Sequence, residues 1–145
     1  MSNTTFSGPV RAGTVKYNAG ANVGNVVLSQ TYDTGDLTGA TVGNVDTRIG
    51  TLPANAIIVD ITIDQVVASV TGTTTVSVGN ASGGAQLSAA VATTAGGRFR
   101  GTATAATQLA WQIGTTDTAI WVRNATGTAT LTAGRFVVTV FYIQK

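Results

Sequence analysis

The six aspartates are the usual general bases that remain in this 145-residue chain, and one aspartate lies in a known catalytic tripeptide. Asp33-Thr34-Gly35 is the signature of aspartic proteases, in which two such aspartates share one proton, so a chain this small would have to dimerise. Here Asp36 follows directly where retroviral-type enzymes carry a small residue, and the apolar run expected before the tripeptide is missing. We interpret the tripeptide as a turn, with Asx-type hydrogen bonding by Asp33 and a positive φ at Gly35.

A second pair of carboxylates, Asp60 and Asp64, lies on one face of a predicted strand. Four residues at about 3.3 Å rise separate their Cα atoms by roughly 13 Å. Glycosidase carboxylate pairs are only ~5–9.5 Å apart, so we interpret the two aspartates as solvent-facing charges that keep an apolar strand soluble. A Ca²⁺ ion near Asp33 and Asp36 stays open, although two aspartates are fewer ligands than a dedicated site usually gathers.

The chain contains no His, no Cys and no Glu, which leaves only aspartate as a usual general base and removes His-dependent triads, thiolate nucleophiles and thiolate metal ligands. The glycine pairs at 83–84 and 96–97 lack the Lys-Ser/Thr that a phosphate-binding loop requires. We therefore predict that the protein is not an enzyme, and that it has no catalytic residues, no metal site and no cofactor.

Arg98 and Arg100 flank Phe99 and are the candidate basic patch. On a strand the two arginines would share one face, and Phe99 would point to the other. Nucleic-acid-binding surfaces normally bring aromatic and cationic side chains together, so we expect no nucleic-acid partner. Bidentate contacts across a subunit interface fit better, which makes Arg98 and Arg100 candidate partner-binding residues.

Charged residues make up only 10% of the chain, compared with about 25% in an average soluble protein. Such a surface avoids the desolvation penalty that ionic side chains incur in an interface, which suits a subunit; an all-β habit would also explain the composition. The net charge of +2 indicates no strongly electrostatic partner. Residues 65–97 are uncharged but are interrupted by polar residues and Gly, and no secretory signal is recognisable, so we expect a soluble chain without a membrane partner.

The elements that must position these side chains are short runs rich in Val, Ile and Thr, separated by Gly and Asn. In residues 56–64, Ile57, Val59, Ile61 and Ile63 alternate with the other side chains, so one face should enter the core. Residues 134–144 are apolar at nearly every position, which predicts a central strand covered on both faces. Further strands are predicted in 24–32, 41–49, 73–80, 118–124 and 127–132, and short helical turns within 85–100 and 104–114.

This pattern predicts an all-β fold, a single antiparallel β-sandwich or jelly roll of about eight strands over residues 23–145. Residues 1–22 form a predicted extended N-terminal arm. About 20 extended residues could reach roughly 65–70 Å, longer than the diameter of the domain. The candidate partner-binding residues in this arm are Phe6, Pro9, Val10 and Arg11.

Residues 118–145, TAIWVRNATGTATLTAGRFVVTVFYIQK, resemble the closing hairpin of small virion structural proteins of tailed bacteriophages. Residues 52–80 and the segment FSGPVRAGT at residues 6–14 are also similar to segments of this group. The resemblance implies a capsid decoration, or cement, protein that binds the assembled shell and reinforces it, commonly as a trimer with a β-sandwich or jelly-roll fold. No active-site residues come with the family.

The composition and the resemblance together favour a homotrimer on the outer capsid surface of a virion, bound where major capsid proteins meet. A second hypothesis is a fibre or tail module that binds a host receptor or glycan, with Trp111 and Trp121 as its stacking platform. Trp121 lies between Ile120 and Val122, however, and is expected to be buried. Another minor head or tail component stays possible, because those proteins also use charge-poor β folds.

Overall fold

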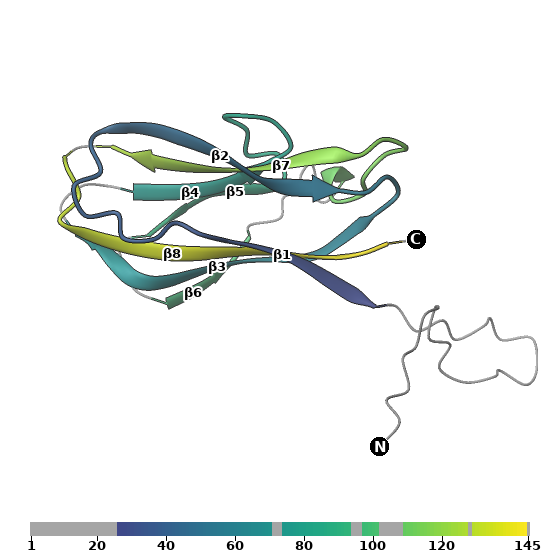
Figure 1. The fold of residues 1–145 in the computed structure, drawn as a ribbon, viewed down its shortest axis with the longest axis horizontal. Helices are drawn as coiled ribbons and strands as arrows, with labels where there is room; N and C mark the ends of the chain where they lie inside the picture. The colour runs from purple at the N-terminus through teal and green to yellow at the C-terminus, as the bar shows by residue number, and fades with distance from the viewer. Residues whose placement is uncertain (1–25, 71–73, 94–96, 102–108, 128, 145) are drawn as a thin grey trace, which may run out of the picture.

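The chain folds into two four-stranded antiparallel sheets packed face to face (Figure 1). The computed structural model describes residues 26–70, 74–93, 97–101, 109–127 and 129–144. The strands among these residues are β1 (Val27–Asp33), β2 (Gly43–Leu52), β3 (Ile57–Val70), β4 (Thr74–Gly79), β5 (Ser88–Ala92), β6 (Gly97–Arg100), β7 (Thr118–Thr126) and β8 (Ala133–Ile143). The all-β sandwich of about eight strands is therefore confirmed.

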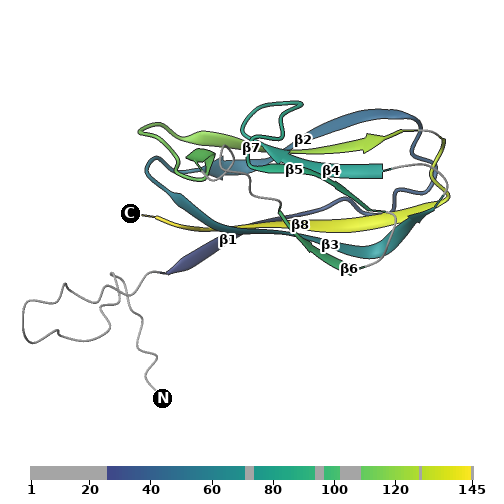
Figure 2. The same ribbon diagram turned by 180° about the vertical axis from the view of Figure 1, so that it is seen from behind.

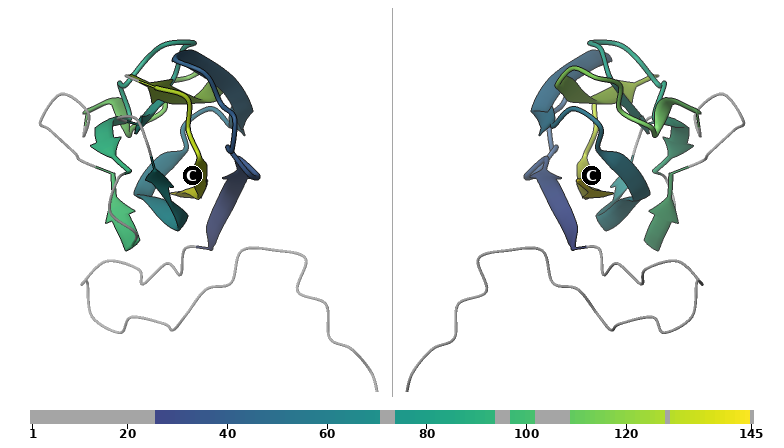
Figure 3. Two further views of the ribbon diagram at one scale, coloured as in Figure 1. Left: turned by 90° about the vertical axis from the view of Figure 1, so that its left-hand side faces the viewer. Right: turned by 90° about the vertical axis from the view of Figure 1, so that its right-hand side faces the viewer.

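The strand order is β1-β8-β3-β6 in one sheet and β2-β7-β4-β5 in the other. Each connection crosses from one sheet to the other except the one between β4 and β5, which pair with each other; this order is that of a jelly roll. Figure 3 looks along the sandwich and shows the two sheets as separate layers. The first and last strands pair with each other, Val27 opposite Ile143, so the start of β1 and the end of β8 lie at the same end of the sandwich (Figure 2).

The core lies between the sheets, and β8 supplies much of it. Phe136, Val138 and Val140 are fully buried, and the side chains between them point outward. The strand lies between β1 and β3, so the predicted central position is confirmed. The prediction that both faces are covered is wrong for the described residues, because the outward side chains of β8 are only half-buried or exposed.

The alternation predicted for residues 56–64 is interrupted by a β-bulge at Val59. In the pairing with β8, Ile58 lies opposite Tyr142 and Asp60 opposite Phe141, so Val59 has no opposite residue and is 44% exposed. An extra residue in one strand shifts the alternation by one position, so the inward-facing residues before the bulge and after it do not belong to the same every-second-residue series. Ile58 is therefore buried in place of Ile57 and Val59, and the predicted core face was wrong for those two residues.

Two further predictions about local structure were wrong. The described part of residues 85–100 contains β5 and β6 instead of a helical turn, because pairing with β4 and β3 outweighs the helix preference of the alanines. Residue 127 and residues 129–132 are a connection and not a strand: Leu131 N donates to Ala40 O at 2.9 Å and Gly39 N donates to Leu131 O at 2.8 Å. The other predicted helical turn is described only from Leu109 onward, where two residues have helical geometry.

Candidate protein interface

The register between β3 and β6 places both predicted arginines on the outer face of the β1-β8-β3-β6 sheet. Arg98 lies opposite Asp64 and Arg100 lies opposite Thr62, so the two arginines share one face of β6. Phe99 points to the other face and packs against the core. The alternation predicted from the sequence is therefore confirmed, while the role of the two arginines in binding a partner stays a prediction.

Each of these arginines meets an aspartate of its own chain. Arg98 donates two hydrogen bonds to the Asp64 carboxylate, from Nε to Oδ1 and from Nη2 to Oδ2, the second at 2.9 Å. Arg100 Nε lies 3.6 Å from Asp60 Oδ2. The bidentate bond with Asp64 raises the pKa of Arg98 above its usual value. Asp60 and Asp64 therefore do more than keep β3 soluble, because they neutralise the charge of the edge strand beside it.

A third pair of the same kind lies on this outer face, between β8 and the end of β1. Arg135 Nη2 donates to Asp33 Oδ2 at 2.6 Å and Arg135 Nε donates to Asp33 Oδ1 at 3.2 Å. The hydrogen bond from Arg135, with a smaller contribution from the Gly35 N–H, lowers the pKa of Asp33 from 3.8 to about 2. Three arginines and three aspartates on one sheet face thus compensate each other pairwise, and the face has little net charge.

Apolar and hydroxyl side chains occupy the rest of this outer face. In the register of the sheet, Val27, Ile143 and Ile57 form one row, and Thr31 and Thr139 form another, with their Oγ1 atoms 3.2 Å apart. Several further apolar side chains on this face are exposed or half-buried, namely Val59, Val67, Val70, Val137 and Phe141. Exposed apolar side chains among charges that are already paired are typical of a protein-binding surface. We call the outward-facing side of the β1-β8-β3-β6 sheet the outer β8 face.

The aspartates singled out for catalysis and metal binding serve local structure instead. Gly35 N donates to Asp33 Oδ1 at 2.8 Å and Gly35 has a φ of 67°, which confirms the predicted Asx turn. Asp36 Oδ1 accepts hydrogen bonds from Thr38 N at 2.9 Å and Thr38 Oγ1 at 2.7 Å, which lower its pKa. Within the described ranges, no three acidic, His or Cys side chains gather as a metal site would require.

The two tryptophans do not form the exposed platform expected of a glycan-binding module. Trp111 packs against the core, and its indole N–H donates to Leu87 O at 2.6 Å. Trp121 is half-buried on the outer face of the other sheet, opposite Arg48, so the prediction that it is buried was wrong. The remaining predicted partner-binding residues, Phe6, Pro9, Val10 and Arg11, lie outside the described residues, as does the predicted arm 1–22.

The pairing of Arg98, Arg100 and Arg135 with aspartates of the same chain was missed from the sequence. Charges of opposite sign on neighbouring strands would indicate such ion pairs, but this signal can be used only when the strand order is known. Arg98 and Asp64, which meet where β3 pairs with β6, are 34 residues apart in the sequence. Arg135 and Asp33, which meet where β1 pairs with β8, are 102 residues apart. No local spacing in the sequence reveals those neighbours.

Solved structures of phage capsids share this fold. A chain in the capsid of Ralstonia phage GP4 matches with a TM-score of 0.62 and 26% identity over 93% of this chain and 92% of that one. A chain in the capsid asymmetric unit of cyanophage Pam1 matches with a TM-score of 0.57 and 24% identity over 97% and 98%. A chain in the acid-stable capsid of Helicobacter pylori bacteriophage KHP30 matches with a TM-score of 0.58 and 15% identity over 82% and 88%.

No protein-family model and no curated protein matches the sequence. The match to the chain in the Ralstonia phage GP4 capsid supports a structural role in a phage virion, as the sequence resemblance predicted, and the other two matches show the shared fold. In the part of the chain that the structure describes, no helix is long and apolar enough to span a membrane.

Proposed function

We propose that this chain is a capsid decoration, or cement, protein that binds the outer surface of a phage capsid and stabilises the shell. The observation that carries the proposal is the outer β8 face, whose exposed apolar side chains lie among charges that are paired within the chain. The capsid chains that share the fold support the same conclusion, because they place this type of sandwich in phage shells. The partner is the major capsid protein.

The paired charges suit the outer β8 face to contact with another protein. An arginine that enters an interface without a counter-charge costs several kcal/mol of desolvation. Arg98 and Arg135 already have carboxylate partners within the chain, so this face can be covered without a compensating charge on the capsid. The apolar side chains between the pairs then supply the free energy of association, at about 25 cal/mol per Å² of apolar surface removed from water.

Three copies joined as a homotrimer would bind the shell more strongly than one. Linking weak contacts in one body makes the second and third contacts intramolecular, so that modest interfaces hold a lattice firmly. The arm, residues 1–22, adds contacts along the exposed sheet edge of a neighbour. Phe6 is its apolar anchor, Pro9 limits its unfolded freedom, and Val10 and Arg11 follow it along the strand edge.

The position of the protein in a purified particle tests the proposal. Decoration predicts about one copy per major capsid protein, measured by quantitative mass spectrometry. A few dozen copies or fewer would indicate a vertex or tail component and would overturn the proposal. Deletion of residues 1–15 should lower capsid occupancy, and unchanged occupancy would refute the role of the arm.

A surface substitution separates the outer β8 face from the rest of the protein. Val70 is 51% exposed on this face and lies opposite Ala133, so Val70→Glu should leave the fold intact but place an unpaired charge in the contact. We expect at least a tenfold loss of affinity for purified capsids. Leu109→Glu is the matched control, because Leu109 is also exposed but lies outside this face. Equal affinities of the two variants would show that the outer β8 face does not bind the shell.

A further inference from the structure

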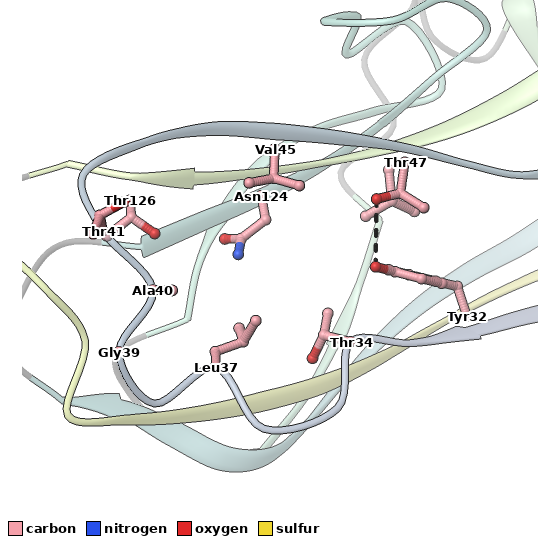
Figure 4. A pocket seen from close by; sticks show the side chains of 11 residues that line it. Tyr32, Thr34, Leu37, Gly39, Ala40, Thr41, Val45, Thr47, Asn124 and Thr126 are labelled. Atoms are coloured by element: carbon pink, nitrogen blue, oxygen red, sulfur yellow. Dashed lines mark hydrogen bonds between the residues drawn. The ribbon is translucent and has the colours of Figure 1, made fainter.

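A pocket of about 310 Å³ lies between the sheets, at the end of the sandwich where β1 passes into β2 (Figure 4). Its walls are formed by Tyr32 of β1, by the connection that follows it up to Thr41, and by the inward side chains of β2 and β7. None of the lining residues carries a charge.

The pocket exists because the sandwich is closed along only part of the side formed by β1 and β2. Gln30 Nε2 donates to Thr51 O at 2.7 Å, and Tyr32 Oη lies 3.4 Å from Thr47 Oγ1, so the two edge strands are linked there. Beyond Tyr32 the chain turns away and bonds to other segments; Leu37 N donates to Gly134 O at 2.8 Å. Val45 is therefore 61% exposed, although it lies opposite Asn124 in the register and faces inward with it.

Asn124 gives this pocket a specific chemical character. The residue is only 8% exposed, and its carboxamide points into the pocket (Figure 4). Its Oδ1 has no hydrogen-bond partner among the described residues. A buried carbonyl without a donor is unfavourable, and the lining, in which threonine hydroxyls alternate with apolar side chains, offers no charge that could neutralise a charged ligand. The pocket thus fits a neutral group that has an apolar body and a hydrogen-bond donor at its tip.

We propose that the pocket binds the side chain of Tyr17 from a neighbouring copy of this chain. A phenol combines an apolar ring with an O–H donor, which matches the wall and the unpaired Oδ1 of Asn124. Phe6 has no donor, so it matches less well. The charges beside the two sites are also complementary. Lys16 precedes Tyr17 in the sequence, and Asp36 lies in the connection beside the pocket and forms no ion pair within the described ranges. The proposal rests on the self-association included in the proposed function.

Chain length favours a neighbouring copy over the same chain. Tyr17 and Val26 are nine positions apart, and the fully extended chain between them spans roughly 30 Å. The path along β1 from Val26 to Thr34 already takes about 26 Å at strand rise. The chain enters β1 at the end of the sandwich opposite the pocket, so it would also have to reverse direction (Figure 1). Little length is left for that reversal, whereas a neighbouring copy has no such constraint.

The natural chain has no cysteine, so disulfide trapping between full-length variants provides a clean test. Chains with Asn18→Cys, which retain Tyr17, are mixed with chains that carry Val45→Cys at the pocket rim. We expect the mixed disulfide to form at least tenfold faster than with chains that carry Val67→Cys on the outer β8 face. Equal rates would overturn the proposal, as would a disulfide that forms only when both cysteines are in the same chain.

Substitutions of the aromatic residues identify the docking side chain. Tyr17→Ala in the Asn18→Cys chain should remove the tenfold preference, Tyr17→Phe should reduce it severalfold, and Phe6→Ala should leave it unchanged. The proposal fails if Phe6→Ala removes the preference or if Tyr17→Phe leaves it intact.

Capsid occupancy of the same proteins separates this inference from the proposed function. Trapping without capsid binding would refute only the decoration role. Capsid binding without the preference for Val45→Cys would refute only the docking of Tyr17.

Discussion

Replacement of Asn124 by leucine should stabilise the isolated fold and at the same time impair docking at the pocket. The side chain is 92% buried, with an exposed fraction of 8%, and its Oδ1 is unpaired in the described part of the chain. A buried polar group without a partner costs about 1–3 kcal/mol, and leucine has a similar volume without that group. We expect a gain of about 1–2 kcal/mol in the free energy of unfolding.

The melting temperature gives a direct measure of this gain. Unfolding entropy is about 2.1 cal/mol/K per residue, or about 0.3 kcal/mol/K for this 145-residue chain. The Asn124→Leu variant should therefore melt about 3–7 °C higher than the natural protein, measured by circular dichroism at one protein concentration, because self-association shifts apparent stability. When Asn124→Leu is introduced into the chain that carries Val45→Cys, disulfide trapping with the Asn18→Cys chain should lose most of its preference for Val45→Cys over Val67→Cys.

A lower melting temperature would refute this reasoning, because it would mean that the carboxamide is satisfied in the folded chain. Thr74→Val is the matched control. Thr74 is fully buried, its Oγ1 is also unpaired in the described part of the chain, and it does not line the pocket. We expect Thr74→Val to raise the melting temperature by a similar amount and to leave disulfide trapping unchanged. A site that is kept polar at a cost in stability indicates function.

Two predictions concern the sheet that carries the outer β8 face. The Asp33 carboxyl should titrate with a pKa of about 2 in NMR spectra, so its contribution to stability is complete above about pH 4 and is lost as the pH falls through 2; Arg135→Met should return the pKa toward 3.8, and an unchanged value would contradict the ion pair. Phe136→Ala should lower the free energy of unfolding by about 3–5 kcal/mol in urea titrations, because the side chain is fully buried; a loss below about 1 kcal/mol would contradict its place in the core.

Local patterns in the sequence predicted most of the fold, because β-strands in a two-sheet sandwich alternate with a period of two. The apolar run at residues 134–144 predicted β8 and its central position. The β-bulge at Val59 could not be predicted, since it depends on the pairing of β3 with β8 and leaves no local mark. β5 was missed for a related reason: its alanines prefer helix in isolation and form a strand only beside β4.

The candidate interface was predictable residue by residue but not as a surface. Alternation around Phe99 placed Arg98 and Arg100 on one exposed face, as the structure has them. Their aspartate partners follow from the strand order, which no pattern within a single strand determines. The pocket was not predicted at all, because it depends on where β1 leaves the sheet, and Asn124 reads in the sequence as an ordinary end to a strand.

The inner face of β7 distinguishes the two surfaces that we propose for contact with other proteins. Ile120 and Val122 are followed on this face by Asn124 and Thr126, so the inward side chains change from apolar to polar along the strand. An apolar ending would have favoured a closed sandwich at that end, since apolar side chains gain free energy by being covered. A polar ending with an unpaired carbonyl instead favours a partner that brings a donor. The outer β8 face has the opposite character, because its charges are already paired within the chain. A subunit that binds its own copies through the pocket can therefore keep the whole outer β8 face available for the capsid.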